Sequence, residues 1–258
     1  MRLRAVGCAG SFPTPRSPAS CYLLEADDDN RTWRIVLDLG NGSFGQLQRW
    51  CAANEIDFLA LSHLHPDHVS DISVLSVARR YHPRLNVGPL AVGGPEGTLE
   101  RIGELSGSSL TAHDAFEVHT WQDRAPITVG PVTITPYAVE HPVPAFGFRI
   151  TGPGEAPNPQ QVVVAYSGDT DYCAGLLTLA RDADFFLVEA SFLENQDVVQ
   201  GVHLSGARAG QAASAAAAKR VVLTHLVNWH DPQEVLHEAQ RTYSGPLELV
   251  RQGAQYLI

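Results

Sequence analysis

The chain has 258 residues, of which 44% are hydrophobic and 18% charged, and its formal net charge is −10. This composition excludes a disordered protein, and the length allows one large core. The acidic balance disfavours long nucleic acid as a partner, because such a surface needs clustered Lys and Arg, and no apolar run reaches the roughly 18 residues of a membrane span.

The opening third of the chain predicts strands and turns. Its first residues alternate polar and apolar side chains over Arg2 to Val6, with no apolar secretion signal, so we expect a cytoplasmic protein. A second strand is predicted over Ser20 to Glu25, and a polar turn at residues 27–30 leads to a third, Trp33 to Leu39, as a hairpin. Helical spacing of large apolar residues predicts a helix over Gly42 to Ala53.

The same spacing rules place the remaining elements. The middle of the chain predicts strand Phe58 to Leu61, helices Val69 to Tyr81 and Pro95 to Leu105, strands Phe116 to His119, Ile127 to Val139 and Phe146 to Ile150, and an exposed loop Gly152 to Pro159. Strands and helices then alternate: strand Val162 to Ser167, helix Ala174 to Arg181, strand Asp184 to Glu189, helix Ser205 to Ala218, strand Arg220 to Thr224, helix Pro232 to Thr242 and strand Leu247 to Val250. This order predicts an α/β (α+β) protein of two mixed sheets packed together with outer helices, as a single domain over residues 1–258.

The strongest functional signal is the string His63-Leu64-His65-Pro66-Asp67-His68. It begins where the strand Phe58 to Leu61 ends. Because Pro66 interrupts the segment, we expect its side chains to converge in a loop rather than to spread around a helix. Four ligand-type side chains within six residues predict a metal site. A solvated polar loop is the alternative interpretation.

Three further candidate ligands follow predicted strands. His141 follows the strand Thr133 to Val139, Asp169 follows Val162 to Tyr166, and His225 follows Val221 to Thr224. Alone, His141 or Asp169 is more often a surface residue or a turn cap. The ends of neighbouring strands meet at one rim of a sheet, so beside the histidine string we expect all three to join it.

Five imidazoles and two carboxylates suit Zn²⁺, Mn²⁺ or Fe²⁺ and not calcium. We expect two divalent ions, with zinc preferred. One would take His63, His65 and His141, the other would take Asp67, His68 and His225, and Asp169 would bridge them. Asp67 is expected to act as a catalytic residue as well as a ligand. Such a centre lowers the pKa of bound water and attracts a small anionic substrate.

This ordered ligand set resembles the metallo-β-lactamase superfamily, which implies a four-layer αβ/βα sandwich with a binuclear site between the sheets. Segments such as Ser167-Gly168-Asp169-Thr170 and His203-Leu204-Ser205-Gly206 look like its phosphodiesterase branch, which includes tRNase Z. The whole chain is most similar to a short bacterial group related to cyclic-AMP phosphodiesterases. The resemblance to tRNase Z implies that His203 protonates the leaving oxygen and that Glu189 holds His203.

One departure from tRNase Z bears on the substrate. That enzyme carries a tRNA-binding arm between the third histidine and the bridging aspartate, whereas here His141 and Asp169 are separated only by a strand, the loop Gly152 to Pro159 and another strand. We therefore expect hydrolysis of a small phosphodiester, foremost 3′,5′-cyclic AMP to 5′-AMP. The alternatives are hydrolysis of a lactone, thioester or β-lactam, RNA 3′-end processing, and metal-dependent binding without catalysis.

The remaining aromatic and histidine residues receive less specific interpretations. Phe12, Phe146 and Trp229 are interpreted either as core residues or as residues that stack on an adenine. Surface or structural roles are expected for His82, His113, His119, His230 and His237. The sequence is compatible with a homodimer and does not decide the oligomeric state.

Overall fold

Two mixed β-sheets form the centre of the computed structural model, which describes residues 1–28, 30–82, 87–107, 114–155, 160–197 and 199–258. Within this part of the chain each sheet has seven strands. The strands Phe58–Ala60, Phe185–Glu189 and Val221–Thr224 are fully buried, as expected for parallel strands covered on both faces. No helix of the described residues is both long and apolar enough to cross a membrane.

The first sheet is built from the N-terminal half and the last strand of the chain. Its spatial order is β14 (Gln255–Leu257), β1 (Arg2–Gly7), β2 (Cys21–Asp27), β3 (Thr32–Leu37), β4 (Phe58–Ala60), β5 (Leu90–Gly94) and β6 (Phe116–Thr120). Strands β1 to β3 pair antiparallel, and β3 to β6 pair parallel. Its helices are α1 (Ser43–Leu47), α2 (Pro66–Val69), α3 (Ile72–Tyr81) and α4 (Thr98–Ser106).

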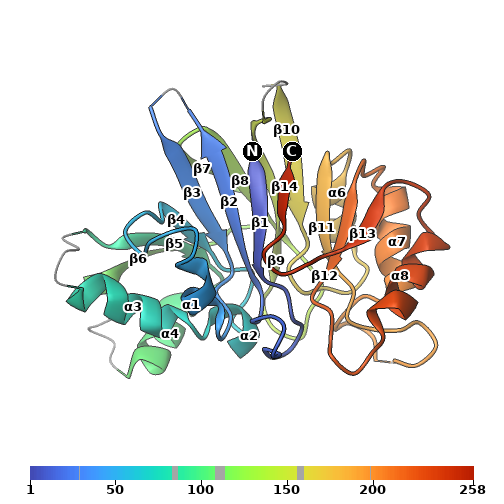
Figure 1. Cartoon of the computed structure of the whole chain (residues 1–258), viewed down its shortest axis with the longest axis horizontal. Coiled ribbons are helices and arrows are strands. Elements are labelled where there is room, and N and C mark those ends of the chain that lie inside the picture. Colours follow the sequence, from blue (N-terminus) through green and yellow to red (C-terminus); the bar gives the residue numbers. More distant parts are fainter. Residues whose placement is uncertain (29, 83–86, 108–113, 156–159, 198) are drawn as a thin grey trace.

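The second sheet likewise combines parallel and antiparallel strand pairs. Its spatial order is β13 (Leu247–Leu249), β12 (Val221–Thr224), β11 (Phe185–Glu189), β10 (Gln161–Tyr166), β9 (Phe146–Pro153), β8 (Val132–Ala138) and β7 (Ile127–Val129). Its helices are α6 (Ala174–Ala180), α7 (Gly206–Ala215) and α8 (Pro232–Gln240). Helices α1, α3 and α4 lie on one side of the paired sheets and α6, α7 and α8 on the other (Figure 1).

Three apolar clusters hold these four layers together. The central cluster lies between the sheets and combines side chains of both, such as Tyr22 of β2 and Tyr166 of β10, whose ring centroids are 5.2 Å apart. A second cluster lies under the first set of helices and a third under the second set. Each large side chain buried in this way contributes roughly 1.5–3 kcal/mol of transfer free energy. The predicted αβ/βα sandwich is thus confirmed.

Several predicted boundaries were wrong for local reasons. The helix predicted over Gly42 to Ala53 ends at Leu47. Just beyond it, the backbone amide of Trp50 donates a hydrogen bond to the Leu47 carbonyl at 2.9 Å. The strand predicted over Ile127 to Val139 is a hairpin that turns at Gly130. A Cβ at Gly130 would lie 2.2 Å from the Trp33 ring, and its φ of +56° favours glycine.

Two strands were missed and one loop is shorter than predicted. The sequence of β5 ends in two glycines, and β14 has only three residues, so neither shows a strand pattern of useful length. The loop predicted over Gly152 to Pro159 begins later, because β9 continues to Pro153. Residues 156–159 of that loop lie outside the described part of the chain.

Candidate metal centre

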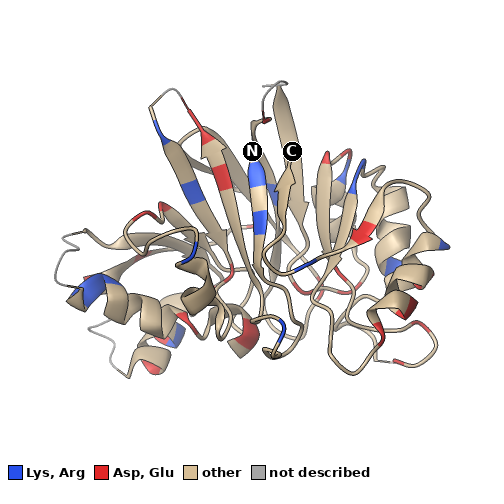
Figure 2. Ribbon diagram, viewed as in Figure 1, with Lys and Arg blue, Asp and Glu red and all other residues tan. Residues whose placement is uncertain are grey.

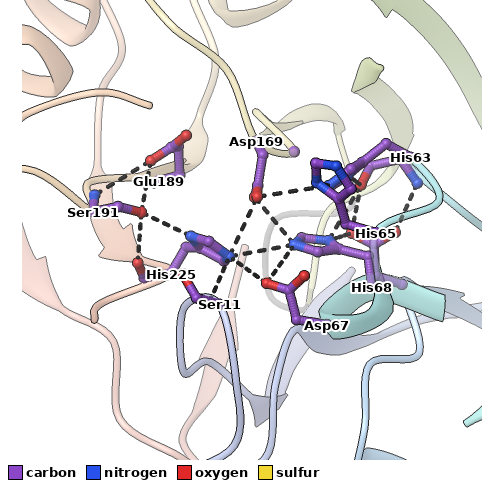
Figure 3. Close-up of polar contacts among 12 residues, drawn as sticks. Ser11, His63, His65, Asp67, His68, Asp169, Glu189, Ser191 and His225 are labelled. Atoms are coloured by element: carbon purple, nitrogen blue, oxygen red, sulfur yellow. Dashed lines mark hydrogen bonds and ion pairs between the residues drawn. The ribbon is translucent and has the colours of Figure 1, made fainter. Parts of the chain in front are cut away.

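The seven predicted ligands meet where strands of both sheets end. His63 and His65 follow β4, His141 follows β8, Asp169 follows β10, and His225 follows β12, while Asp67 and His68 belong to α2. Figure 3 shows the side chains of Asp67, His68, Asp169 and His225 turned toward one another. His63, His68, Asp169 and His225 are almost fully buried, which is costly for polar groups without partners.

The histidine string is not wholly a loop, contrary to prediction. Pro66 begins the one-turn helix α2, with His65 as its extended N-terminal cap at φ −67° and ψ 150°. Proline is well tolerated at the first helical position, where its missing N–H would have no partner. The helical turn brings Asp67 and His68 into one group, while His63 and His65 remain in the extended segment before it.

A glycine in the neighbouring loop fixes the position of α2. A Cβ at Gly40 would lie 1.8 Å from the carbonyl oxygen of Asp67, too close for any side chain. We expect Gly40→Ala to lower the free energy of unfolding by about 1–3 kcal/mol, as overpacking does, and to weaken metal binding by displacing Asp67 and His68. Urea titration and metal analysis measure both effects. The matched control is Gly45→Ala in α1, where a Cβ meets nothing within 4 Å; equal losses in both variants would contradict the steric argument.

Three histidines form the first ligand group. His65 Nδ1 lies 3.1 Å from His63 Nε2 and 3.1 Å from His141 Nε2. A neutral imidazole has one nitrogen that donates and one that accepts. Three nitrogens converging at these distances present lone pairs to a common point. This donor set fits a borderline cation such as a first-row divalent metal.

Two carboxylates and two histidines form the second group. His225 Nε2 lies 3.3 Å from His68 Nε2, 3.1 Å from Asp67 Oδ2 and 3.3 Å from Asp169 Oδ2. All four ligand atoms lie within 4.8 Å of one another. Two unprotonated nitrogens at 3.3 Å repel each other unless a proton or a cation lies between them. The second group therefore also fits a divalent ion.

Asp169 connects the two groups. Its Oδ2 is 3.3 Å from His225 Nε2 and 3.7 Å from His63 Nε2. Its Oδ1 lies 3.2 Å from His68 Nε2, yet this buried oxygen accepts no hydrogen bond. A buried carboxylate oxygen without a donor is costly, and a metal ion would remove that cost.

Protonation states in the two groups suit metal binding. Burial opposes the charge of Asp169, but the neighbouring His225 and His68 outweigh it and hold the pKa of the carboxyl well below its usual range. Burial lowers the pKa values of His63, His65 and His141. Ligands bind metal as carboxylates and neutral imidazoles, so Asp169 and these three histidines are ready to bind without a large cost of deprotonation. His68 is the exception, because the Asp169 and Asp38 carboxylates outweigh its burial and raise its pKa, so it must lose a proton when an ion binds.

Partners behind the ligands orient three of the imidazoles. Asp38 Oδ2 contacts His68 Nδ1 at 2.7 Å, and Ser191 Oγ contacts His225 Nδ1 at 2.8 Å. His141 Nδ1 donates to the Val202 carbonyl at 2.8 Å. Each contact occupies the ring nitrogen that faces away from the centre and so sets the tautomer. No role was predicted from the sequence for any of these three partners; the position of Asp38 directly after the apolar strand β3 was the one available signal.

Asp38 is the most connected of these partners. Besides His68, it accepts hydrogen bonds from the Ser62 amide at 2.7 Å, the Ser62 hydroxyl at 2.8 Å and the Tyr166 hydroxyl at 2.6 Å. It is fully buried. One carboxylate therefore joins the strand before the histidine string to the opposite sheet.

We expect Asp38→Ala to weaken metal affinity by about 10- to 100-fold, the usual effect of removing a partner behind a ligand. The variant also leaves buried donors of Ser62 and Tyr166 unsatisfied, at about 1–3 kcal/mol each. Competition with a chromogenic chelator measures the affinity. Glu117→Ala, at an exposed carboxylate on β6, is the control; metal affinity within twofold of the unmodified protein in both variants would contradict the assignment.

A histidine–carboxylate pair lies beside the ligands. His203 Nδ1 is 2.8 Å from Glu189 Oε1. Glu189 also accepts from the Thr170 amide at 2.9 Å and the Ser191 hydroxyl at 3.0 Å. Because these donors occupy its oxygens, Glu189 orients His203 rather than binding metal, although His225 lies near both.

The surroundings of His203 suit a proton donor. Burial opposes a charge on the ring, but the Glu189 carboxylate outweighs it and raises the pKa of His203 to about 9. Its ring centroid is 5.5 Å from that of His141 and 5.3 Å from that of His225, so it faces both ligand groups. His203 also lines a cavity of about 410 Å³, together with residues such as Phe192 and Arg208. Bound dications would lower this pKa toward neutrality by repulsion.

None of the other histidines of the described residues belongs to either ligand group. His82, His119 and His237 are exposed, and His230 Nε2 is 2.9 Å from Asp197 Oδ2. His113 lies outside the described residues. Phe146 packs against the central core, whereas Phe12 and Trp229 are exposed. Between His141 and Asp169 the described residues form the two predicted strands, β9 and β10.

Comparisons with known proteins identify the family of the chain. A family model described as a β-lactamase superfamily domain matches residues 33–226. An uncharacterised protein of Mycobacterium leprae is 41% identical over 99% of this chain and 88% of its own. The probable metallo-hydrolase YhfI of Bacillus subtilis is 28% identical over 98% of both chains, and ribonuclease Z of Myxococcus xanthus is 24% identical over 98% of this chain and 96% of its own.

The fold comparison gives the same answer. The crystal structure of YhfI, a metallo-β-lactamase fold protein, matches with a TM-score of 0.85 at 26% identity and covers 99% of this chain and 98% of that one. The resemblance inferred from the histidine string is therefore confirmed. The chain belongs to the β-lactamase superfamily, in its tRNase Z-like branch, and is a metal-dependent hydrolase.

Proposed function

We propose that the chain hydrolyses a small phosphodiester at a centre of two divalent ions, with 3′,5′-cyclic AMP to 5′-AMP as the preferred reaction. The observation that carries this proposal is the His203–Glu189 pair beside both ligand groups. A phosphodiester releases an alkoxide, which needs a proton to leave at neutral pH. A histidine held by a carboxylate supplies that proton.

Different residues of the chain have different roles in this reaction. His63, His65 and His141 would hold one ion, Asp67, His68 and His225 the other, and Asp169 would contact both. When bound, such ions supply Lewis acidity for the phosphoryl oxygens and an activated water at neutral pH. We propose zinc, because imidazole-rich sites with few carboxylates favour it over harder cations; manganese and iron are the other candidates.

His203 performs the remaining chemical step. With Nδ1 directed at Glu189, its Nε2 is free to face the substrate and to donate a proton to the departing 3′ oxygen. Glu189 keeps the ring in that tautomer and stabilises its protonated form. Asp67, inside the second ligand group, would hold an ion that supplies the attacking water and would help to orient that water.

Charge supports a small substrate. Lys and Arg are dispersed among Asp and Glu across both sheets, with no continuous basic stripe on the ribbon drawn in Figure 2, and the net charge of −10 repels a polyanion. The sequence between His141 and Asp169 is too short to hold two strands and also an arm for a large RNA. One relative is a ribonuclease Z, and ribonucleases also cleave phosphodiesters, which agrees with the bond type.

A turnover screen of the metal-loaded protein tests the proposal. It compares cyclic AMP, bis(p-nitrophenyl) phosphate, a precursor tRNA, a lactone, a thioester and a β-lactam under one set of conditions. We expect kcat/KM for the small phosphodiesters to exceed the other values by at least about 100-fold, since the acid matches that leaving group. Faster turnover of the lactone, thioester or β-lactam would overturn the phosphodiester assignment, and faster cleavage of precursor tRNA would overturn the small-substrate assignment.

A further inference from the structure

Two large aromatic side chains, Phe12 and Trp229, are exposed in loops that lead to or from the segment of His225. Phe12 is 43% exposed and Trp229 is 56% exposed, although neither residue belongs to any of the three apolar clusters. Their ring centroids are 5.8 Å apart and their planes are inclined by 34°. Residues more than 200 positions apart in the sequence thus form one aromatic surface that the core does not use. Contiguous exposed apolar surface of this kind marks a binding site.

The Phe12 side of this surface is fixed to a candidate metal ligand. The Ser11 amide lies 3.4 Å from His225 Nε2, the nitrogen that faces the centre, as the dashed line between the two residues in Figure 3 shows. The Gly10 amide donates to the Leu226 carbonyl at 3.1 Å. A Cβ at Gly10 would lie 2.5 Å from the His225 carbonyl oxygen, so the loop packs there at backbone contact. Phe12 directly follows these anchors.

The Trp229 side is anchored on the same strand end. Trp229 lies four residues after His225 in the loop that follows β12. Its neighbour His230 is 2.9 Å from Asp197, in the segment that leads to His203. The aromatic pair is therefore tied both to a ligand of the centre and to the segment of the proton donor. A ligand that reaches both the centre and the pair would have its orientation set by the pair.

We propose that Phe12 and Trp229 form a stacking platform for the nucleobase of a nucleotide substrate. The proposal rests on the phosphodiester chemistry proposed above. A cyclic nucleotide joins a phosphodiester to a flat aromatic ring through one sugar, which is the combination that a metal centre with an adjoining aromatic pair can bind. Every base has a π-face, so stacking gives affinity for bases as a class, and truncation of a stacking aromatic lowers affinity by about 10- to 100-fold per base.

Binding calorimetry on the metal-loaded full chain tests this platform with two ligands that differ only in the base. 5′-AMP contains the base, and ribose 5-phosphate lacks it. We expect the unmodified protein to bind AMP more tightly than ribose 5-phosphate. We expect Phe12→Ala, Trp229→Ala and the double variant to lose about 10- to 100-fold in AMP affinity, with ribose 5-phosphate affinity unchanged. Tyr81→Ala, at an exposed aromatic residue of α3, is the matched control and should change neither affinity.

Three outcomes would overturn the platform. AMP affinity within twofold of the unmodified protein in the double variant excludes stacking. Equal losses for AMP and ribose 5-phosphate indicate damage to the phosphate site instead. A change in sedimentation coefficient with unchanged AMP affinity shows that the pair is a contact between copies of the chain.

The same measurements separate this inference from the proposed function. If cyclic AMP is not hydrolysed but AMP binding depends on Phe12 and Trp229, the reaction was assigned wrongly and the platform stands. If cyclic AMP is hydrolysed and the variants keep AMP affinity and the KM of cyclic AMP, the platform alone is wrong.

Discussion

Replacing Asp169 by alanine should reduce bound metal to one equivalent or less and lower turnover by about 10³-fold or more. Asp169 Oδ2 lies 3.7 Å from His63 Nε2 in one group and 3.3 Å from His225 Nε2 in the other, so its removal breaks the link between them. Metal ions contribute several kcal/mol of charge stabilisation in such reactions, and each 1.36 kcal/mol is tenfold in rate.

Elemental analysis after metal reconstitution and a turnover assay measure the two effects. Asp169→Asn, with nearly the same shape, guards against a variant that simply fails to fold. Asp114→Ala, at an exposed aspartate, is the control. Two equivalents of metal and full turnover in both Asp169 variants would refute the binuclear centre.

His203→Ala should keep its metal and lose about 10²–10⁴ in kcat toward cyclic AMP, the usual contribution of a general acid. Glu189→Gln should follow in the same direction, because the amide cannot stabilise the protonated ring that its carboxylate now contacts at 2.8 Å.

A change of leaving group distinguishes a proton donor from a structural histidine. p-Nitrophenolate leaves without a proton, so the loss in the His203→Ala variant should be much smaller with bis(p-nitrophenyl) phosphate than with cyclic AMP. Equal losses on the two substrates would point to a structural role. His237→Ala, at an exposed histidine of α8, should change neither rate.

The sequence predicted the candidate ligands because each follows an apolar strand, and strand ends are visible in the pattern of side chains. Residues such as His141 and Asp169 carried no motif of their own, yet their places after β8 and β10 sufficed once the histidine string was recognised. The sandwich followed from the order of strands and helices together with the family resemblance.

What the sequence could not predict depends on contacts between distant segments. Asp38 and His68 meet across 30 residues, and Ser191 and His225 across 34, so no spacing rule connects them. The break at Gly130 depends on the ring of Trp33, which belongs to the other sheet. Such close contacts form only when the two sheets pack against each other, so no local sequence pattern predicts them. The exposure of Phe12 and Trp229 was likewise undecided until both loops had positions.

The candidate ligands come from both sheets: four follow β4 in one, and three follow β8, β10 and β12 in the other. Ions bound there would link the two sheets, and loss of the ions would remove that link. Binding to the native state alone, at a thousandfold excess over Kd, adds about 4 kcal/mol to stability. Metal supply would then govern how long each molecule survives proteolysis as well as how fast it works.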